Sequence, residues 1–272
     1  MPHVRTALGT TSQASPLQLQ YIYPDSEVRT ILGVELLVAT ADRAIALLDE
    51  RVTKNQGTIV AFANAHTLNV AATTSGFRDA LNSFIVLNDG VGTDIASRLL
   101  YGRRFPENLN GTDFTPRYLR ETKCRFSIFL LGAKPGVAER AAVRLADQCP
   151  QHRIVGFHHG YVYQQDDQVV TMIRDSGADL LLVAMGNPQQ ELWLRDNFAA
   201  TGCQLGIAVG ALLDFIAGEV PRANERVRAM RLEWAYRLAC EPRRLWFRYI
   251  VGNPVFLMRV AAQWALAARV GF

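Results

Sequence analysis

A carboxylate stands where a buried strand gives way to a helix. Residues 84–87 (Phe-Ile-Val-Leu) form a short continuous apolar run, the pattern of a strand buried on both faces. The run ends at Asn88-Asp89-Gly90, and residues 91–100 then have the pattern of a helix. In open α/β sheets, ligands bind at the carboxyl ends of parallel strands. Asp89 is therefore the candidate catalytic base, and the alternative is a turn residue chosen for local hydrogen bonding.

Other polar side chains also follow strand-like runs. Asn64 and His66 come directly after the apolar residues 58–63. A helix cap is the favoured explanation for Asn64, and a ligand contact is the alternative. His158 and His159 end a further strand, and they have no additional Cys or His partners at metal-ligand spacing. They indicate a pocket or a structural role rather than a metal site.

Two strand-to-helix turns could hold a phosphorylated ligand. Gly132 and Gly136 would let backbone amides approach a phosphate. The pattern is neither a GxGxxG fingerprint nor a P-loop, so dinucleotide binding and ATP hydrolysis are poorly supported. Gln189, Gln190 and Glu191 open another helix, where part of their role is capping and where amides can also hydrogen-bond a sugar or a uracil.

The elements that must position these groups alternate between strand and helix. Apolar runs predict strands over 31–38 (at an edge), 58–63, 84–87, 125–131, 152–157, 178–184 and 205–209. Helical spacing lies between them, over 41–52, 67–80, 91–100, 114–121, 136–148, 167–176 and 189–199, with a helix cap at Thr112-Asp113 and a loop over 101–110. Such alternation predicts an α/β fold with a doubly wound parallel sheet. After residue 218 only helices are predicted, over 223–240, 243–251 and 255–269.

The positive charge is confined to the C-terminal part of the chain. From Pro221 onward there are ten arginines against three glutamates, a net charge of +7, although the whole chain of 272 residues carries only +4. Arginines in this part alternate with aromatic residues such as Trp234, Trp246 and Tyr249. This composition favours a surface that lies on an anionic bilayer, with a solvated basic face as an equal alternative. Nucleic acid is a third option, but no recognisable binding module supports it.

Composition sets further bounds. The four cysteines are far apart and form neither a zinc pattern nor a disulfide framework, which favours a reducing compartment. No run of about 20 uninterrupted apolar residues occurs, so no transmembrane helix is expected. We predict a flexible leader over 1–25, a catalytic domain over 26–218 and a basic helical appendage over 219–272.

Taken together, the motifs resemble the WecG/TagA/CpsF family of glycosyltransferases, from about residue 28 to residue 259. The segments that carry the resemblance are Phe-Ala-Asn-Ala-His (62–66), Asn-Asp-Gly-Val-Gly (88–92), Asn-Gly-Thr-Asp (110–113), Gly-Phe-His-His-Gly-Tyr (156–161), Gly-Asn-Pro-Gln-Gln-Glu-Leu-Trp (186–193), Val-Gly-Ala (209–211), Leu-Glu-Trp-Ala-Tyr-Arg-Leu (232–238) and Glu-Pro-Arg-Arg (241–244). So many motifs in one order make the resemblance specific.

The resemblance implies a Rossmann-like fold and an inverting transferase that uses a UDP-sugar. The implied acceptor is a saccharide on a polyprenyl diphosphate at the cytoplasmic face of the membrane, so an anionic inner-leaflet lipid is a further expected partner. The family's proposed base corresponds to Asp89, and its sugar-nucleotide contacts correspond to Asn64 and Gln190, with Gln189 and Glu191 adjacent. The wider predicted site adds His66, Asn88, Gly90, Asn108, Asp113, Gly132, Gly136 and His159, and from the appendage Arg222, Arg226, Arg231, Arg237, Arg243 and Arg244.

No cofactor and no metal are expected, because the chain has no Asp-x-Asp pattern. Two positions depart from the family: Phe62 stands where Thr is frequent, and Asn108 stands where Arg is frequent. The 107–113 version resembles the branch that builds exopolysaccharides of the xanthan or acetan type, which favours a glucosyl donor. N-acetylmannosamine and its uronic acid are the main competing sugars, and a catalytically dead, membrane-attached binding module is the alternative from another class. No nucleic-acid partner is expected, and self-association is left open.

Overall fold

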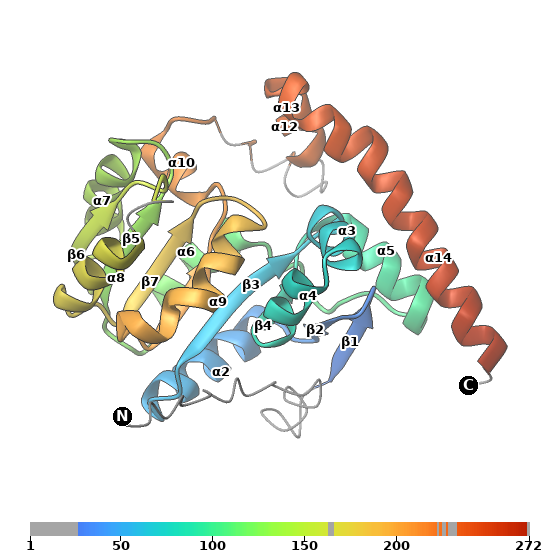
Figure 1. The fold of residues 1–272 in the computed structure, drawn as a ribbon, viewed down its shortest axis with the longest axis horizontal. Coiled ribbons are helices and arrows are strands. Elements are labelled where there is room, and N and C mark those ends of the chain that lie inside the picture. The colour runs from blue at the N-terminus through green and yellow to red at the C-terminus, as the bar shows by residue number, and fades with distance from the viewer. Residues whose placement is uncertain (1–26, 163–165, 222, 225–226, 228–232, 271–272) are drawn as a thin grey trace, which may run out of the picture.

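A six-stranded parallel sheet forms the centre of the molecule (Figure 1). The computed structural model describes residues 27–162, 166–221, 223–224, 227 and 233–270. The strand order is β4-β3-β8-β7-β5-β6, so the chain winds outward to both edges and returns to the middle. The strands are β3 (Thr58–Ala63), β4 (Ile85–Asn88), β5 (Ser127–Gly132), β6 (Arg153–His158), β7 (Leu180–Ala184) and β8 (Leu205–Ala208). The predicted α/β, doubly wound, Rossmann-like fold is confirmed.

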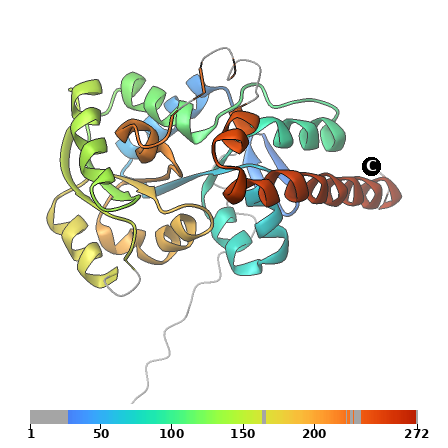
Figure 2. The same cartoon turned by 90° about the horizontal axis from the view of Figure 1, so that it is seen from above.

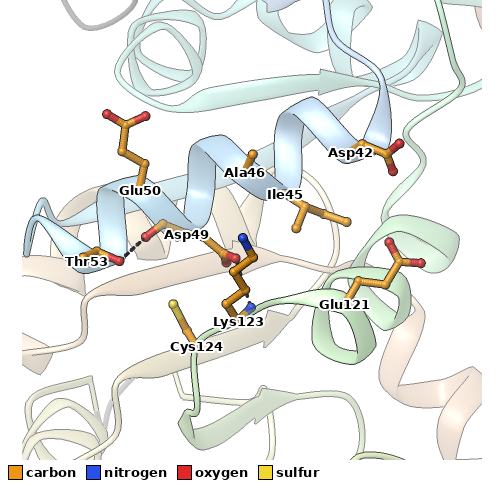
Figure 3. A pocket seen from close by; sticks show the side chains of 9 residues that line it. All are labelled: Asp42, Ile45, Ala46, Asp49, Glu50, Thr53, Glu121, Lys123 and Cys124. Carbon is orange, nitrogen blue, oxygen red and sulfur yellow. Dashed lines mark hydrogen bonds between the residues drawn. The ribbon is translucent and has the colours of Figure 1, made fainter.

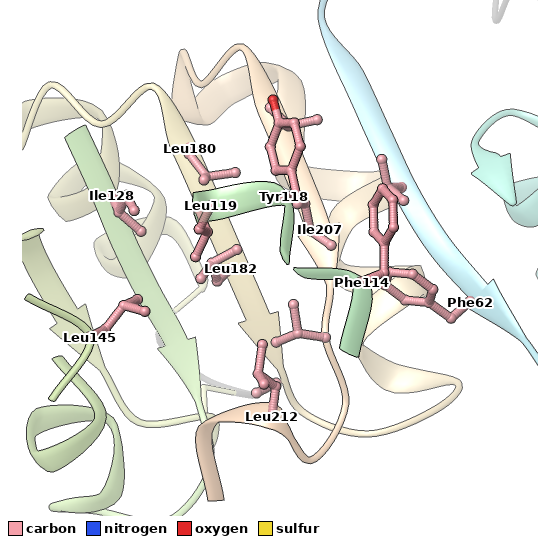
Figure 4. Packing of buried hydrophobic residues seen from close by; sticks show 14 of the residues in the cluster. Phe62, Phe114, Tyr118, Leu119, Ile128, Leu145, Leu180, Leu182, Ile207 and Leu212 are labelled. Carbon is pink, nitrogen blue, oxygen red and sulfur yellow. The ribbon is translucent and has the colours of Figure 1, made fainter. Parts of the chain in front are cut away.

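Helices cover both faces of the sheet, because successive strand residues point to opposite sides. The first buried cluster includes the side chains of Phe62 and Ile207 (Figure 4). Leu130 belongs to the same cluster. The second includes their strand neighbours Ala63, Leu131 and Ala208. The first face packs against α2 (Ala41–Thr53), α6 (Gly111–Glu121), α7 (Val137–Gln148) and α10 (Leu212–Ala217). The second packs against α3 (Ala65–Thr73), α4 (Ser75–Asn82), α5 (Gly90–Tyr101), α8 (Asp166–Asp175) and α9 (Gln189–Thr201).

The predicted first strand over 31–38 is wrong as a single element. The chain instead forms an antiparallel hairpin of β1 (Val28–Ile31) and β2 (Val34–Leu37), which stands apart from the main sheet. Leu32 and Gly33 both have positive φ, 51° and 81°, as a tight hairpin turn requires. The reversal is hard to see in the sequence because it lies inside an apolar run and Gly33 is its only turn signal.

The helix predicted over 67–80 is also divided in two. Thr74 adopts an extended conformation (φ −130°, ψ 97°) between α3 and α4. The loop predicted over 101–110 is confirmed, since α5 ends at Tyr101 and α6 begins at Gly111. The cap of α6 is Asn110 rather than Thr112-Asp113, because the Asn110 side chain accepts a hydrogen bond from the Asp113 amide at 3.0 Å.

The C-terminal appendage consists of α12 (Glu233–Cys240), α13 (Pro242–Trp246), the π-helical turn η1 (Phe247–Val251) and α14 (Gly252–Val270). The predicted break between residues 251 and 255 is absent, since α13, η1 and α14 follow one another without a gap. Helix α14 lies against α3 and α5 (Figure 2). Phe256 and Val260 are buried there in the second cluster. The division of domains at residue 218 stays a prediction.

Joining these segments produces a helical stretch that the sequence pattern did not anticipate. Residues Phe247–Arg269 are long and apolar enough to cross a membrane by length and composition, with a mean hydropathy of 1.2 in the most apolar window and 11% of that window buried. Core helices of soluble proteins can have the same length and composition, so this observation alone does not place α14 in a bilayer.

Candidate active site

A large cavity of about 1130 Å³ opens at the carboxyl ends of the central strands. Its walls come from the ends of β3, β7 and β8, the start of α5, the loop before α6, and the appendage. Eight of the predicted donor- or acceptor-binding residues line it together with Asp89, namely Asn64, His66, Gly90, Asn108, Asp113, Gln189, Gln190 and Glu191. Residues from distant parts of the sequence therefore face one volume.

Sheet register brings Asn64 and Asp89 together. Ala63 pairs with Asn88 across the parallel strands β3 and β4, so the next residue of each strand leaves the sheet side by side. Asn64 Nδ2 donates a hydrogen bond to Asp89 Oδ2 at 3.1 Å. Asn64 Oδ1 accepts from the backbone amides of His66 and Thr67 at 3.1 and 3.2 Å. Asn64 thus caps α3 and also orients the carboxylate. Its contact with a ligand stays a prediction.

Burial dominates the electrostatics of Asp89. Desolvation raises the pKa of its carboxyl group, because the charged form loses hydration. The hydrogen bond from Asn64 and the charges of Arg248 and Arg237 lower the pKa of Asp89, whereas the charge of Asp113 raises it. A carboxylate with a raised pKa, held in place by one amide, is suited to accept a proton from a substrate hydroxyl.

The loop before α6 is anchored beneath this carboxylate. Asn88 is fully buried, and its Nδ2 donates to the carbonyl of Glu107 at 2.9 Å. The Gly90 amide donates to Asn108 Oδ1 at 2.7 Å. Asn108 therefore satisfies an amide at the start of α5, next to the carboxylate. Asn88 lies behind the cavity wall and holds the loop.

Gln190 and Glu191 connect two further strand ends. Gln190 Oε1 accepts a hydrogen bond from the Gly210 amide at 3.0 Å, which ties the start of α9 to the loop after β8. Gln190 Nε2 donates to Glu191 Oε1 at 2.9 Å. Burial raises the pKa of Glu191 to about 7, with Gln190 and Asn187 acting in the opposite direction. Glu191 therefore orients Gln190 from a position that is 1% exposed.

We expect Glu191 to make folding stability depend on pH. Its folded pKa, about 7, exceeds the ordinary value of 4.5, so the folded state binds more protons between these values. The stability that protonated Glu191 contributes is fully present below pH 4.5 and is lost as the pH rises through 7. Glu191→Gln should remove this loss, and urea unfolding at pH 5, 6 and 7 measures the difference between variant and wild type. Glu139→Gln, at an exposed site on α7, is the control; identical pH slopes for wild type and Glu191→Gln would contradict the assignment.

The appendage contributes a cation that the predicted site omitted. Arg248, on η1, donates from Nη2 to Asn64 Oδ1 at 3.2 Å, across 184 positions of sequence. Arg237, on α12, lines the cavity and lies over the Phe215 ring at 5.7 Å. The sequence signal for Arg248 is its place among alternating arginines and aromatics. The structure adds that it lies on η1 and reaches Asn64.

Asn69 fastens α14 to the sheet domain. Its Nδ2 donates to the carbonyl of Gly252 at 2.7 Å. Arg259 Nη1 donates to Asn69 O and Oδ1 at 2.9 and 3.0 Å. The appendage is therefore held against α3 through Asn69, which lies in the same helix that Asn64 caps.

His66 is an uncharged wall of the cavity. Burial lowers its pKa to about 4, and the charge of Arg248 acts in the same direction. A neutral imidazole can donate or accept a hydrogen bond, so His66 can contact a ligand without adding charge.

Several predicted residues do not line the cavity. Gly132, Gly136 and His159 are outside the lining, while their neighbours Ala133, Lys134, Gly160 and Tyr161 line it. A Cβ on Gly132 would stand 2.4 Å from the Ala184 carbonyl oxygen, so close backbone packing accounts for that glycine. Arg243 is exposed and outside the lining. Arg222, Arg226 and Arg231 lie outside the described residues, as does the side chain of Arg244.

Phe62 lines the cavity near the end of β3. Its ring packs on Phe114, with ring centroids 6.1 Å apart. A Cβ on Gly111 would stand 2.7 Å from a carbon of the Phe62 ring, so the phenylalanine needs a glycine opposite it.

Gly111→Ala should therefore destabilise the fold by about 1–3 kcal/mol through overpacking. The cost should be smaller in a Phe62→Leu background, because the smaller side chain leaves room for the new methyl group. Chemical denaturation of the four members of this cycle measures the coupling. Gly57→Ala is the matched control, since its Cβ would meet Phe198 at an ordinary 3.8 Å. Equal effects of Gly111→Ala in both backgrounds would contradict the contact.

A second cavity of about 540 Å³ lies between α2 and the end of α6 (Figure 3). Its lining includes Asp49, Glu50, Glu121, Lys123 and Cys124, and none of the predicted site residues. Asp49 is occupied structurally, because its carboxylate accepts from Thr122 Oγ1 at 2.5 Å and from the Lys123 amide at 3.0 Å. This cavity is separate from the candidate active site.

A comparison with protein families agrees with this geometry. The model of the glycosyl transferase WecG/TagA/CpsF family matches residues 29–269, which includes all the described residues of the cavity. The match extends through the appendage as well as the sheet, so the elements that carry Asp89 and Arg248 both fall within it. The chain belongs to the WecG/TagA/CpsF family of glycosyltransferases.

Proposed function

We propose that this glycosyltransferase moves a sugar, with glucose favoured, from a UDP-sugar to a saccharide linked to a polyprenyl diphosphate, with inversion at the anomeric carbon. The observation that carries the proposal is the half-buried Asp89 carboxylate, oriented by Asn64 at 3.1 Å in a cavity that arginines of the appendage also line. The cavity thus combines a base with positive charge, as displacement of a diphosphate requires. The competing sugars are N-acetylmannosamine and its uronic acid.

The reaction is a single displacement. Asp89 accepts the proton of an acceptor hydroxyl, whose oxygen forms a bond to the anomeric carbon. The bond between that carbon and the diphosphate oxygen breaks at the same time, and UDP leaves from the opposite face with the electron pair. Arg248 and Arg237 lie close enough to Asp89 to lower its pKa, so their charges also reach the region where the diphosphate gains charge.

The appendage would bring the enzyme to the inner face of the plasma membrane, where it acts as a peripheral protein. Exposed Trp246 and Phe247 stand beside arginines on α13 and η1, the combination that favours an anionic bilayer surface. The products would then belong to bacterial exopolysaccharides or other cell-surface polysaccharides. Self-association stays an open prediction.

The proposal is tested by incubating the protein with a panel of UDP-sugars and lipid-linked mono- and oligosaccharides, with and without EDTA. We expect one UDP-hexose to be transferred at the same rate in both conditions, because metal independence is part of the proposal. Transfer that EDTA abolishes would contradict the role given to the arginines. A protein that binds UDP-sugars without transferring any would support the dead binding module instead.

Removing the appendage tests whether it completes the site. The appendage is proposed to close over the donor only at the membrane, so deletion of the residues after Pro221 should abolish transfer and leave the sheet folded. Because that deletion also exposes apolar partners of Phe256, the full-length variant Asn69→Ala gives a second route. It removes the two hydrogen bonds that the Asn69 side chain makes with α14. Circular dichroism checks the fold, and a fully active truncated protein would contradict this role.

A further inference from the structure

Helix α5 carries an exposed apolar stripe that begins next to the candidate base. Val91, Ile95 and Leu99 recur every fourth residue, so they lie on one side of the helix. Their exposed fractions are 38%, 46% and 39%. The opposite side of α5 is fully packed, since Thr93, Ala96 and Ser97 are inaccessible to solvent. This stripe is therefore not part of the core.

Helix α14 continues this apolar surface beside α5. Leu257 and Trp264 are seven positions apart, hence on one side of α14, and are 40% and 48% exposed. The two helices are in close contact near the start of α5, because a Cβ added at Gly92 would lie 3.6 Å from the Phe256 ring. They are also joined further along, because the Tyr101 hydroxyl and Gln263 Nε2 both donate to the carbonyl of Thr30 at 3.0 Å. They run side by side away from the cavity (Figures 1 and 2).

The surface is continuous with the active-site cavity. Val91, Ile95 and Leu257 line the same cavity as Asp89. We name these three residues, together with Leu99 and Trp264, the apolar strip. The strip therefore leads outward from the base along α5 and α14.

The charges around the strip are compatible with a phosphorylated lipid. No Asp or Glu occurs between Pro242 and Val270. The one carboxylate of α5, Asp94, is buried and accepts from the Phe105 amide at 3.3 Å. Arg259 also lines the cavity, and its hydrogen bonds to Asn69 go to neutral oxygens, so its positive charge is not compensated by them. A diphosphate at the cavity and a hydrocarbon chain on the strip would both meet suitable surroundings.

We propose that the apolar strip binds the isoprenoid chain of the lipid-linked acceptor and thereby delivers the acceptor hydroxyl to Asp89. This inference rests on the proposed function and adds the subsite for the lipid. The acceptor chain is favoured over general contact with the bilayer because the strip starts inside the catalytic cavity rather than at a separate surface. Burial of each apolar group of the chain favours binding, so two substituted positions suffice for a measurable effect.

The test compares acceptors that differ only in chain length. Initial rates are measured in detergent with a long-chain isoprenoid diphosphate saccharide and with a short-chain, water-soluble analogue. For the wild type we expect a preference for the long chain in kcat/KM. In Ile95→Gln/Leu99→Gln the preference should fall about tenfold, through a higher KM for the long chain. Met172→Gln on α8, a 45% exposed apolar residue away from the strip, should keep the preference.

Two further measurements separate the alternatives. Binding of a long-chain polyprenyl monophosphate in micelles should weaken in the double variant, even if no donor sugar supports transfer, so this arm stands when the proposed function fails. Flotation with vesicles of phosphatidylcholine and phosphatidylglycerol should be unchanged. A wild type without chain-length preference, or a double variant that loses vesicle binding and keeps the preference, would overturn the proposal. A change in oligomeric state on size-exclusion chromatography would assign the strip to a second copy instead, and would also overturn it.

Discussion

Asp89→Asn is expected to slow sugar transfer by about 10²–10⁴-fold, the usual contribution of a positioned general base. The substitution keeps the shape of the side chain, and its amide oxygen can still accept the hydrogen bond from Asn64 Nδ2. The variant cannot accept the proton from the acceptor hydroxyl. The KM for the donor should change little, because binding is separate from proton removal.

The pH dependence of the wild type adds a second readout. Asp89 must be ionised to act as a base, so kcat/KM should rise with pH through its pKa, which burial raises above the usual range. This acid limb should be lost in Asp89→Asn. Asp79→Asn, at an exposed position on α4, is the control for the substitution itself. Full transfer by Asp89→Asn and Asp89→Ala would contradict the role of Asp89, and equal UDP-sugar binding without transfer in all proteins would indicate a binding module.

Arg248→Gln is expected to lower kcat by about 10²–10³-fold, the range found when a group that stabilises developing charge is removed. The substitution also removes a charge that lowers the pKa of Asp89, so the acid limb of the pH profile should move to higher pH. The pKa of His66 should rise as well, because Arg248 lowers it in the wild type.

Arg269→Gln, in the last turn of α14, controls for the loss of an appendage charge. It should keep the wild-type pH profile, since Arg269 does not line the cavity. A reduced rate in Arg248→Gln with an unshifted acid limb would mean that Arg248 supports the fold of the appendage and does not act on the site. An unchanged rate would remove it from the mechanism.

The sheet could be predicted from sequence because five of its six strands are almost entirely buried, and the partly exposed edge strand β6 still has an apolar run. Each strand appears as an apolar run closed by polar or glycine residues, and the carboxyl edge follows from that order. The hairpin at Leu32-Gly33 was not predicted, because the chain reverses inside an apolar run. The break at Thr74 was not predicted, because the helical spacing continues on both sides of it.

The parts of the site that depend on long-range docking could not be predicted. Asn64 and Asp89 lie at adjacent strand ends, so sheet order alone brings them together. Arg248 reaches Asn64 only because α14 docks on α3 and because η1 turns its side chain inward, and neither contact has a local sequence signal. Phe62 and Asn108, the two positions that differ from the residues frequent in the family, have structural explanations. Phe62 packs on Gly111, and Asn108 accepts the hydrogen bond from the Gly90 amide.

The most direct test of a single displacement with Asp89 as the base is the anomeric configuration of the product. An α-linked UDP-sugar should give a β-glycoside, read from the anomeric coupling constant in the proton NMR spectrum of the transferred sugar. Inversion with no trapped covalent intermediate is the expected result. A product that retains the α configuration would require two displacements, and would contradict the mechanism built on Asp89.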